Sequence, residues 1–516
     1  MKLLFASSVS CTLLMDENGD YYAHSAYTLF LNGEKACEGD LSVCSLYGLL
    51  PDTEYALECR SDGRDPLSMT FRTQKEYCAL DVRRFGAKGD GVTDDTQALQ
   101  AAILCCPDGG RVTLPRGVYK SGPLFLKSHI TVDFKQGAVL SLLTDKARFP
   151  VLPGVTRTSD EKDEYLLGSW EGNPLNCYAA AITGINVCDV KIIGEGIVDG
   201  CAQQAGWWIE PKKYKHIYRG RLFYLKDCAD ITVQGIHFRN SPAWNLHPTF
   251  SHGLTFLNVF VEAPSDSPNT DGFDPESCRD IRMYGTAFSV GDDCIAIKSG
   301  KIYMGAKYHT PSENIEIAWC HMQRGHGGVT IGSEMAGGVK NVTVHHCRMT
   351  DNDRGLRIKT RRGRGENGVI DNIVFSDVVM ERVLLPLAVN SMYFCDPDGH
   401  SEFVQSREPQ PVNETTPRVG SILYERVRAE GCSSCTAYIL GLPERPVESI
   451  ALRDCEFSFV QGTKPMTPIM AEGITPVSQA GVIAHYVKSL TLKNVIMRNI
   501  RGERLQKVAV ENAEDR

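Results

Sequence analysis

Asn314-Ile315-Glu316-Ile317 and Asn341-Val342-Thr343-Val344 are two copies of one short pattern, in which a small or polar residue precedes two apolar residues that flank a variable one. Further copies begin at Asp189, Asp230, Gly253, Asp280, Asn372 and Ser449, and most intervals run from about 23 to about 50 residues, which is typical of stacked repeats. The alternation indicates short strands with one buried face, and such strands bury a core only by stacking. We therefore predict an all-β fold, a right-handed parallel β-helix.

Four polar motifs follow one another at about the interval of this repeat. They are Asn269-Thr270-Asp271, Gly291-Asp292-Asp293-Cys294, Gly325-His326-Gly327 and Arg357-Ile358-Lys359. Equivalent strands of successive coils lie about 4.8 Å apart, so residues that are one coil apart in sequence become neighbours in space. The spacing predicts that three carboxylates, one imidazole and two cations line one face of the β-helix.

The carboxylates of this set have the features of an acid-base pair. Asp292 and Asp293 would point to opposite faces of an ideal strand, so a bend, which Gly291 permits, is needed to bring both into one cleft. Repulsion beside Asp271 would raise the pKa of one carboxyl, and a general acid and a general base result. The alternatives are solvated turn aspartates or a calcium site that also includes Asp274.

The imidazole and the cations would complete the cleft. His326 lies between two glycines, which leave room for a substrate, and its position favours a role in orienting the acid carboxyl. Arg357 and Lys359 alternate by two, so they share one face of a strand and offer a planar fork and a point charge to a sugar carboxylate. The set predicts acid-catalysed cleavage of an anionic sugar polymer.

In this order the four motifs resemble those of glycoside hydrolase family 28, the polygalacturonases and their relatives. The resemblance runs from about Ala79 to the C-terminus and includes Phe85-Gly86-Ala87-Lys88-Gly89-Asp90-Gly91 and Thr93-Asp94-Asp95-Thr96. It implies that Asp292 protonates the glycosidic oxygen, that Asp271 and Asp293 hold and deprotonate the attacking water, and that the anomeric carbon is inverted. It also implies that His326 supports Asp292 and that Arg357 and Lys359 bind the galacturonate carboxylate beside the scissile bond.

Three further segments resemble bacterial exo-acting members of the family: Leu167-Gly168-Ser169-Trp170-Glu171-Gly172-Asn173, Ser241-Pro242-Ala243-Trp244 and Gly332-Ser333-Glu334-Met335. Exo action from the non-reducing end requires that one end of the cleft is closed. The segment from Ser159 to Asn176 could form the wall at that end or could be a solvated loop. Further candidates for substrate binding are Asn269, Lys298, Glu334, Tyr393 and Trp244, with Trp207 and Trp208 as additional stacking aromatics or core residues.

Other activities remain alternatives to an exo-acting galacturonan hydrolase. Within the family they are an endo-polygalacturonase and a rhamnogalacturonan or xylogalacturonan hydrolase, although the presence of His326, Arg357 and Lys359 favours galacturonan. Outside it they are a calcium-dependent pectate lyase and a non-catalytic pectin-binding protein. Binding alone does not require three crowded carboxylates, which argues against a non-catalytic pectin-binding protein. No metal or cofactor is expected.

The N-terminal segment has a different pattern. Tyr27-Thr28-Leu29-Phe30-Leu31-Asn32-Gly33 and Met69-Thr70-Phe71-Arg72-Thr73 alternate as in a small antiparallel sandwich, and the corner from Leu49 to Tyr55 resembles fibronectin type III domains. We expect residues 1–76 to form this domain, as a spacer or a cleft wall, and residues 77–516 to form the β-helix.

Charge and cysteine content indicate the partners and the compartment. A net charge of −8 over 516 residues argues against nucleic acid and membrane surfaces, so a local basic patch must meet the polyanionic substrate. Lys2-Leu3-Leu4-Phe5-Ala6 is followed by serines and is expected to be a strand rather than a signal peptide. Nineteen cysteines, scattered and odd in number, indicate reduced thiols. Cytoplasmic residence is expected, with a secreted or periplasmic location as the alternative; the sequence does not determine the oligomeric state.

Overall fold

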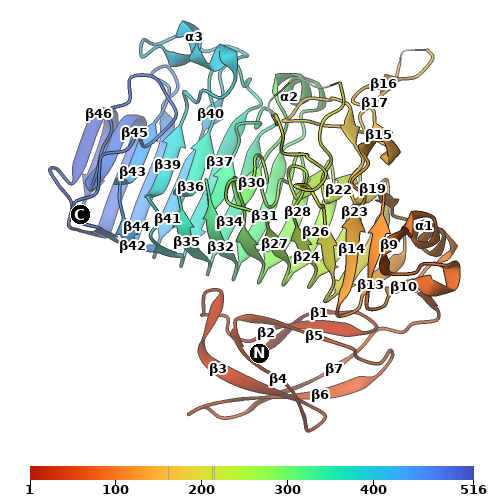
Figure 1. The fold of residues 1–516 in the computed structure, drawn as a ribbon. Helices are drawn as coiled ribbons and strands as arrows, with labels where there is room; N and C mark the ends of the chain where they lie inside the picture. The colour runs from red at the N-terminus through yellow and green to blue at the C-terminus, as the bar shows by residue number, and fades with distance from the viewer. Residues whose placement is uncertain (161, 212, 214–215) are drawn as a thin grey trace.

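The structure is a computed structural model that describes residues 1–160, 162–211, 213 and 216–516. Nearly all of its regular elements are strands, and most of them stack in parallel register along one axis (Figure 1). The predicted parallel β-helix is therefore confirmed. Among the described residues no helix is long and apolar enough to cross a membrane.

The first ladder of strands carries the repeat seen in the sequence. It contains β8 (Ala79–Asp81), β10 (Gly110–Leu114), β13 (Ile130–Phe134), β20 (Cys188–Gly194), β23 (Ala229–Gln234), β26 (His252–Leu257), β28 (Arg279–Tyr284), β31 (Ser312–Ala318), β34 (Val339–His345), β37 (Val369–Ser376), β41 (Ser421–Glu425), β44 (Val447–Phe459), β45 (Ala480–Arg498) and β46 (Leu505–Asp515). The first apolar residues of neighbouring copies pair directly, for example Ile281 with Ile315 and Ile315 with Val342. Asn314 and Asn341 have φ angles of 56° and 54°, and asparagine tolerates this left-handed conformation better than most residues.

The second ladder continues each coil. It contains β9 (Asp90–Asp94), β11 (Gly117–Ser121), β14 (Ala138–Leu142), β21 (Ile197–Asp199), β24 (His237–Arg239), β27 (Phe260–Glu262), β29 (Ala287–Ser289), β32 (His321–Gly325), β35 (Arg348–Asn352), β38 (Val379–Glu381) and β42 (Arg428–Cys432), which pairs with the end of β44.

The third ladder carries the functional motifs. It contains β12 (Leu124–Phe125), β19 (Ile182–Ile185), β22 (Phe223–Lys226) and β25 (Leu246–Thr249), then β30 (Ile295–Ile297), β33 (Val329–Ile331), β36 (Arg354–Lys359), β39 (Leu385–Asn390) and β43 (Cys435–Leu440). Phe273 joins the two groups through isolated bridges to Leu246 and Ile295. Apolar side chains from all three ladders fill one continuous core.

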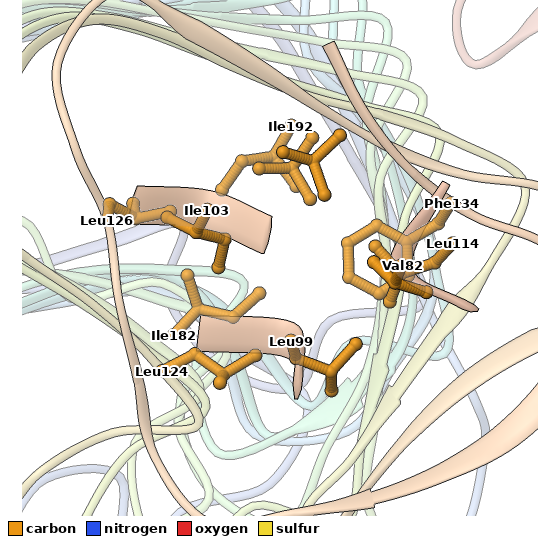
Figure 2. Close-up of a pocket in the computed structure, with 11 residues that line it drawn as sticks. Val82, Leu99, Ile103, Leu114, Leu124, Leu126, Phe134, Ile182 and Ile192 are labelled. Atoms are coloured by element: carbon orange, nitrogen blue, oxygen red, sulfur yellow. The ribbon is translucent and has the colours of Figure 1, made fainter. Parts of the chain in front are cut away.

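Short elements lie at the ends and on the loops of the β-helix. They are α1 (Thr96–Cys105), α2 (Ile302–Tyr308), α3 (Glu402–Gln405), the 3-10 helices Val82–Phe85, Lys146–Arg148 and Pro397–His400, and the strands β15 (Val151–Leu152), β16 (Thr156–Arg157), β17 (Glu164–Tyr165), β18 (Cys177–Tyr178) and β40 (Arg418–Val419). Leu99 and Ile103 of α1 face core residues such as Phe134 and Ile192 around an entirely apolar space (Figure 2). Helix α1 therefore covers the N-terminal end of the core, and this space has no polar group that could act on a substrate.

The N-terminal strands form two antiparallel sheets around a core of their own. One contains β1 (Lys2–Ala6), β2 (Ser10–Leu14) and β5 (Val43–Tyr47), and the other contains β3 (Tyr22–Leu31), β4 (Glu34–Leu41), β6 (Glu54–Ser61) and β7 (Leu67–Arg72). Lys2–Ala6 is thus a strand, as expected. The sheets pack on the flank of the β-helix opposite α2 and α3 (Figure 1). Ser10 Oγ donates to Gln234 Oε1 at 2.6 Å, and Asp20 pairs with Arg348 at 2.7 Å.

Candidate active site

Four of the polar motifs meet on the outer face of the third ladder. Asp292 and Asp293 are separated from β30 by Cys294, His326 lies before β33, and Arg357 and Lys359 lie in β36. Carboxylate oxygens of Asp271, Asp292 and Asp293 lie within 4.8 Å of one another. The register inferred from the spacing therefore brings the three carboxylates together.

Glycines allow the backbone to bend at the carboxylates. The Asp293 amide donates to Asp292 Oδ1 at 3.0 Å, so the two adjacent side chains are not on opposite faces of a regular strand. A Cβ atom on Gly291 would lie 2.3 Å from the Ser267 carbonyl oxygen, and one on Gly327 would lie 2.7 Å from Asp293 Oδ1. Both positions require glycine because the neighbouring atoms leave no room for a side chain.

Asp293 is the ionised member of the cluster. It is 1% exposed, and it pairs with Lys359 Nζ at 2.9 Å and with Arg357 at 3.3 Å. Burial favours its neutral form, but the two cations outweigh burial and hold the pKa of Asp293 below its usual range. The two cations that were predicted to meet a sugar carboxylate therefore also pair with a buried one, and one positive charge remains in excess.

Asp271 and Asp292 hold protons more tightly. Burial, followed by the charge of Asp292 and Asp274, raises the pKa of Asp271 well above its usual range. Burial and the charge of Asp293 raise the pKa of Asp292. Asp292 is half-buried whereas Asp271 is buried, so Asp292 is the better placed of the two to reach a substrate. Asp271 Oδ1 has no hydrogen-bond partner among the described side chains.

His326 is oriented by a residue that the sequence analysis did not single out. Its Nδ1 lies 2.8 Å from Asp353 Oδ2, and its backbone amide donates to the Asp292 carbonyl oxygen at 3.1 Å. The hydrogen bond to Asp353, and then the charge of Asp292, raises the pKa of His326 against an opposing effect of burial. Asp353 lies one coil beyond His326, so the repeat interval was a signal that could have revealed it.

Lys298 and Glu334 form a buried ion pair on the same two coils as Asp292 and His326. Lys298 Nζ lies 3.1 Å from Glu334 Oε2, 3.6 Å from Asp274 Oδ1 and 4.6 Å from the centre of the Trp244 ring. Burial disfavours the lysine cation, but Glu334 and Asp274 outweigh burial and raise the pKa of Lys298. This pair links the predicted substrate-binding residues Lys298, Glu334 and Trp244 into one cluster.

The remaining candidates have different surroundings. Tyr393 is in the site, because Lys359 Nζ lies 5.5 Å and Arg357 Cζ 5.8 Å from the centre of its ring. Asn269 Oδ1 accepts a hydrogen bond from Arg219 at 2.6 Å, which occupies this oxygen within the protein. Trp207 belongs to the hydrophobic core and Trp208 packs against it.

Part of the Ser159–Asn176 segment folds against this cluster; its residue 161 lies outside the described residues. Trp170 and Asn173 exchange backbone hydrogen bonds of 2.9 and 3.0 Å, which makes a tight turn with Glu171 and Gly172 at its tip. The Lys301 amide donates to the Gly172 carbonyl at 2.9 Å, and a Cβ on Gly172 would lie 2.9 Å from Glu334 Cβ. The turn therefore borders the Lys298–Glu334 pair.

The carboxylate cluster is a poor cation site. Three carboxylates at this separation have the oxygen ligands that calcium prefers. However, Lys359 and Arg357 already neutralise Asp293, and Lys298 adds a further positive charge near Asp271. A divalent ion would therefore meet three fixed cations around the cluster.

Comparisons with known proteins show the family of the chain. The model of Glycosyl hydrolases family 28 matches residues 126–456, more than half of the chain, and a model described as Rhamnogalacturonase A/epimerase, pectate lyase-like, matches residues 79–132. A Vitis vinifera protein named "Probable polygalacturonase" is 29% identical over 420 residues, which are 78% of this chain and 80% of that protein.

Two solved structures share the fold. The exopolygalacturonase of Thermotoga maritima has 27% identity and a TM-score of 0.66, with 82% of this chain and 93% of that chain covered. The family 28 exopolygalacturonase of Yersinia enterocolitica has 16% identity and a TM-score of 0.73, with 100% and 97% covered, and this likeness shows the fold alone. Because the family model matches more than half of the chain, including the four polar motifs, the chain belongs to glycoside hydrolase family 28 and is a glycosidase.

Proposed function

We propose that this enzyme hydrolyses the α-1,4-galacturonosidic bonds of oligogalacturonides, from the non-reducing end and with inversion. The observation that carries the proposal is the contrast within one cluster between Asp292, half-buried with a raised pKa, and Asp293, buried and ionised. One group can donate a proton while the other accepts one, as general acid-base catalysis requires.

In the proposed mechanism Asp292 protonates the glycosidic oxygen, Asp271 helps to hold the attacking water, and the ionised Asp293 accepts the proton of that water. The carboxylate oxygens lie within 4.8 Å, closer than the roughly 6.5–9.5 Å usual in inverting glycosidases. Inversion in so compact a site requires the water to be held by the carboxylates themselves rather than placed between two distant ones. Family membership supports inversion, and NMR of the first-formed anomer tests it.

The charges indicate which sugar lies where. The electrostatic partners of Asp292 include Lys359 and Arg357, whereas those of Asp271 include Asp274 and Lys298. The proton donor thus faces the Arg357 side of the cluster, so we place the leaving residue, with its carboxylate, on Arg357 and Lys359. His326, held by Asp353, lies beside Asp292, and its raised pKa favours the protonated ring there.

The exo mode rests on two supports. The Trp170–Asn173 turn borders the Lys298–Glu334 pair and so narrows the cleft there. The Thermotoga maritima relative, with 27% identity, is an exopolygalacturonase. An endo-acting enzyme or a hydrolase of decorated galacturonan would instead require room around this turn.

Replacement of Asp292 tests the catalytic assignment. We expect Asp292→Asn to lower kcat on oligogalacturonides by about 10²–10⁴-fold, because an amide cannot donate the proton, with little change in KM. Asp266→Asn, at an exposed position before the Asn269 motif, is the matched control and should retain full activity. Residual turnover of Asp292→Asn above a tenth of the normal rate would remove Asp292 from the acid role.

Product analysis tests the reaction class. With chelator present, saturated mono- or digalacturonate should appear from the start of the reaction without ultraviolet absorbance. An unsaturated product that requires calcium would identify a lyase, and a mixed ladder of products would identify an endo-acting enzyme.

We also propose a domain division and a compartment. Residues 1–76 would form a fibronectin type III-like spacer and residues 77–516 the catalytic domain; the separate core of the N-terminal sheets supports this division. The nineteen cysteines are all free thiols, which supports residence in the reducing cytoplasm, where the substrate would be imported oligogalacturonides. Limited proteolysis between Arg72 and Ala79, followed by mass spectrometry, tests the boundary.

A further inference from the structure

The outer face of the third ladder changes character immediately after Arg357. Thr330, Arg357, Ala388, Tyr438 and Ile483 occupy equivalent positions on successive coils and form one lateral row. Ala296 and Thr330 precede Arg357 in this row, and the three residues that follow it have aliphatic or aromatic side chains. Ala388 is 2% exposed, and Tyr438 and Ile483 are each 6% exposed. Thr330, on the near side of Arg357, is buried as well, so the segment that covers the far side decides whether a sugar chain could extend there.

The chain from Val460 to Gln479, here called the 460–479 loop, covers these positions. Ile469 and Ala471 of the loop pack in one hydrophobic cluster with Ala388, Tyr438 and Ile483. This cluster is separate from the interior core of the β-helix, so the loop is packed onto the outside of the coils by its own apolar contacts. Burial of these side chains favours the closed position over an open one.

Met470 brings the loop to the cleft itself. An Arg357 guanidinium nitrogen lies 3.5 Å from Met470 Sδ. The Met470 carbonyl oxygen accepts hydrogen bonds from Asn390 Nδ2 at 2.9 Å and from the Phe394 amide at 3.2 Å. Arg354 donates to the Pro468 carbonyl at 3.0 Å. Polar contacts from β36, β39 and the following segment thus hold the loop beside Arg357.

The result is a closed end on the side where the leaving sugar is placed. Arg357 and Lys359 are only 12% and 9% exposed, and a small pocket between them is lined by Tyr393, Asn390 and Met470. One coil advances about 4.8 Å along the axis, close to the length that one sugar residue adds to a chain. A second sugar beyond Arg357 would have to occupy the volume that the 460–479 loop fills.

We propose that the Arg357–Lys359 position is the last subsite on this side of the cleft, and that the 460–479 loop restricts the enzyme to short oligogalacturonides with one residue on the leaving side. Digalacturonate, with its leaving residue beside Met470, is the shortest such substrate. This inference rests on the proposed function, since it takes galacturonate as the bound sugar and Arg357 as its leaving-side contact.

Substrates that extend past the leaving residue test the inference. We would compare kcat/KM for free digalacturonate, its methyl glycoside and its p-nitrophenyl glycoside at the reducing end, all three with a closed sugar ring. We expect the aromatic group to lower kcat/KM on the order of 100-fold by displacing the sugar from its reactive position, with the methyl glycoside between the two. Galacturonate release from the non-reducing side is measured in each case.

Two variants of the 460–479 loop distinguish the steric effect of Met470 from the effect of any substitution in this loop. Met470→Ala should raise the ratio of kcat/KM for the p-nitrophenyl glycoside to kcat/KM for free digalacturonate about tenfold, because it removes the side chain beside Arg357. The backbone of Met466 pairs with that of Val477 within the loop, and Met466→Ala should leave the same ratio unchanged. Each rate is taken relative to the same variant's rate on free digalacturonate, and an unchanged Tm shows that both variants are folded.

Three results are decisive. Equal kcat/KM for the free and the p-nitrophenyl substrates in the unmodified enzyme would overturn the closed end while leaving the proposed function intact. Faster hydrolysis of long polygalacturonate than of digalacturonate, per chain end, would do the same. Failure to hydrolyse any galacturonide, free digalacturonate included, would instead overturn the proposed function and this inference with it.

Discussion

Replacement of Lys359 by methionine tests the electrostatic account of the site. Methionine keeps most of the length of the side chain but removes the charge that lies 2.9 Å from Asp293 Oδ2. Arg357, 3.3 Å from the other oxygen of the same carboxyl, would remain. The substitution therefore leaves a buried carboxylate with one cation instead of two.

The size of the effect follows from this geometry. At 2.9 Å and an effective dielectric constant of about 20, the attraction that is lost is about 6 kcal/mol. Relief of the desolvation of the buried lysine returns several kcal/mol, and Arg357 still compensates Asp293, so we expect a net loss of about 2–3 kcal/mol. The unfolding entropy of a chain of 516 residues is about 1 kcal/mol/K, so Tm should fall by about 2–3 °C.

The loss should depend on pH in a defined direction. The pKa of Asp293 is lowered in the folded protein, so its stabilising contribution is present above the ordinary aspartate value of 3.8 and disappears as pH falls through the folded value. The difference in stability between the two proteins should therefore be complete at pH 7 and shrink below about pH 4.

Calorimetry at pH 7 and at pH 3.5 measures this difference, and activity on digalacturonate measures the loss of carboxylate binding. Lys493→Met, at an exposed position of β45, is the matched control and should change neither. A Lys359→Met protein with normal Tm at pH 7 would show that Lys359 does not stabilise Asp293, and the assignment of Asp293 as the ionised carboxylate would lose its basis.

Three further predictions concern the same site. Asp353→Asn should move the pKa of His326 down toward its usual 6.5, as seen in the NMR titration of the ring, with a change in stability below about 1 kcal/mol because both side chains are partly exposed. The stabilising effect of this pair should be complete below pH 6.5 and vanish as pH rises through the higher folded value; an unchanged titration would exclude Asp353 as its cause. Gly327→Ala should cost about 1–3 kcal/mol and reduce kcat/KM, because the added carbon would lie 2.7 Å from Asp293 Oδ1, and normal denaturant unfolding and kinetics would contradict this. NMR of the first product should show the β-anomer of galacturonate at the newly formed end, whereas the α-anomer would indicate retention.

Much of the fold was predictable because its signals are local. The Asn314 and Asn341 copies of the repeat specify a turn residue and alternating faces within four residues, and stacking places equivalent residues in register. The same register brought Asp271, Asp292 and Asp293 together, since their motifs lie about one coil apart. Asp353 was accessible to this reasoning as well, one coil beyond His326.

The sequence by itself determined the repeat, the parallel stacking and the set of candidate catalytic side chains, because each depends on short-range pattern and on a regular interval between coils. Only the tertiary structure decided where the cleft ends. The contact of Met470 with Arg357 joins residues that are 113 positions apart, across a loop with no repeat to set its path. The path of that loop is determined by apolar packing of Ile469 and Ala471 on the coils beneath, and such packing depends on the assembled surface rather than on local sequence.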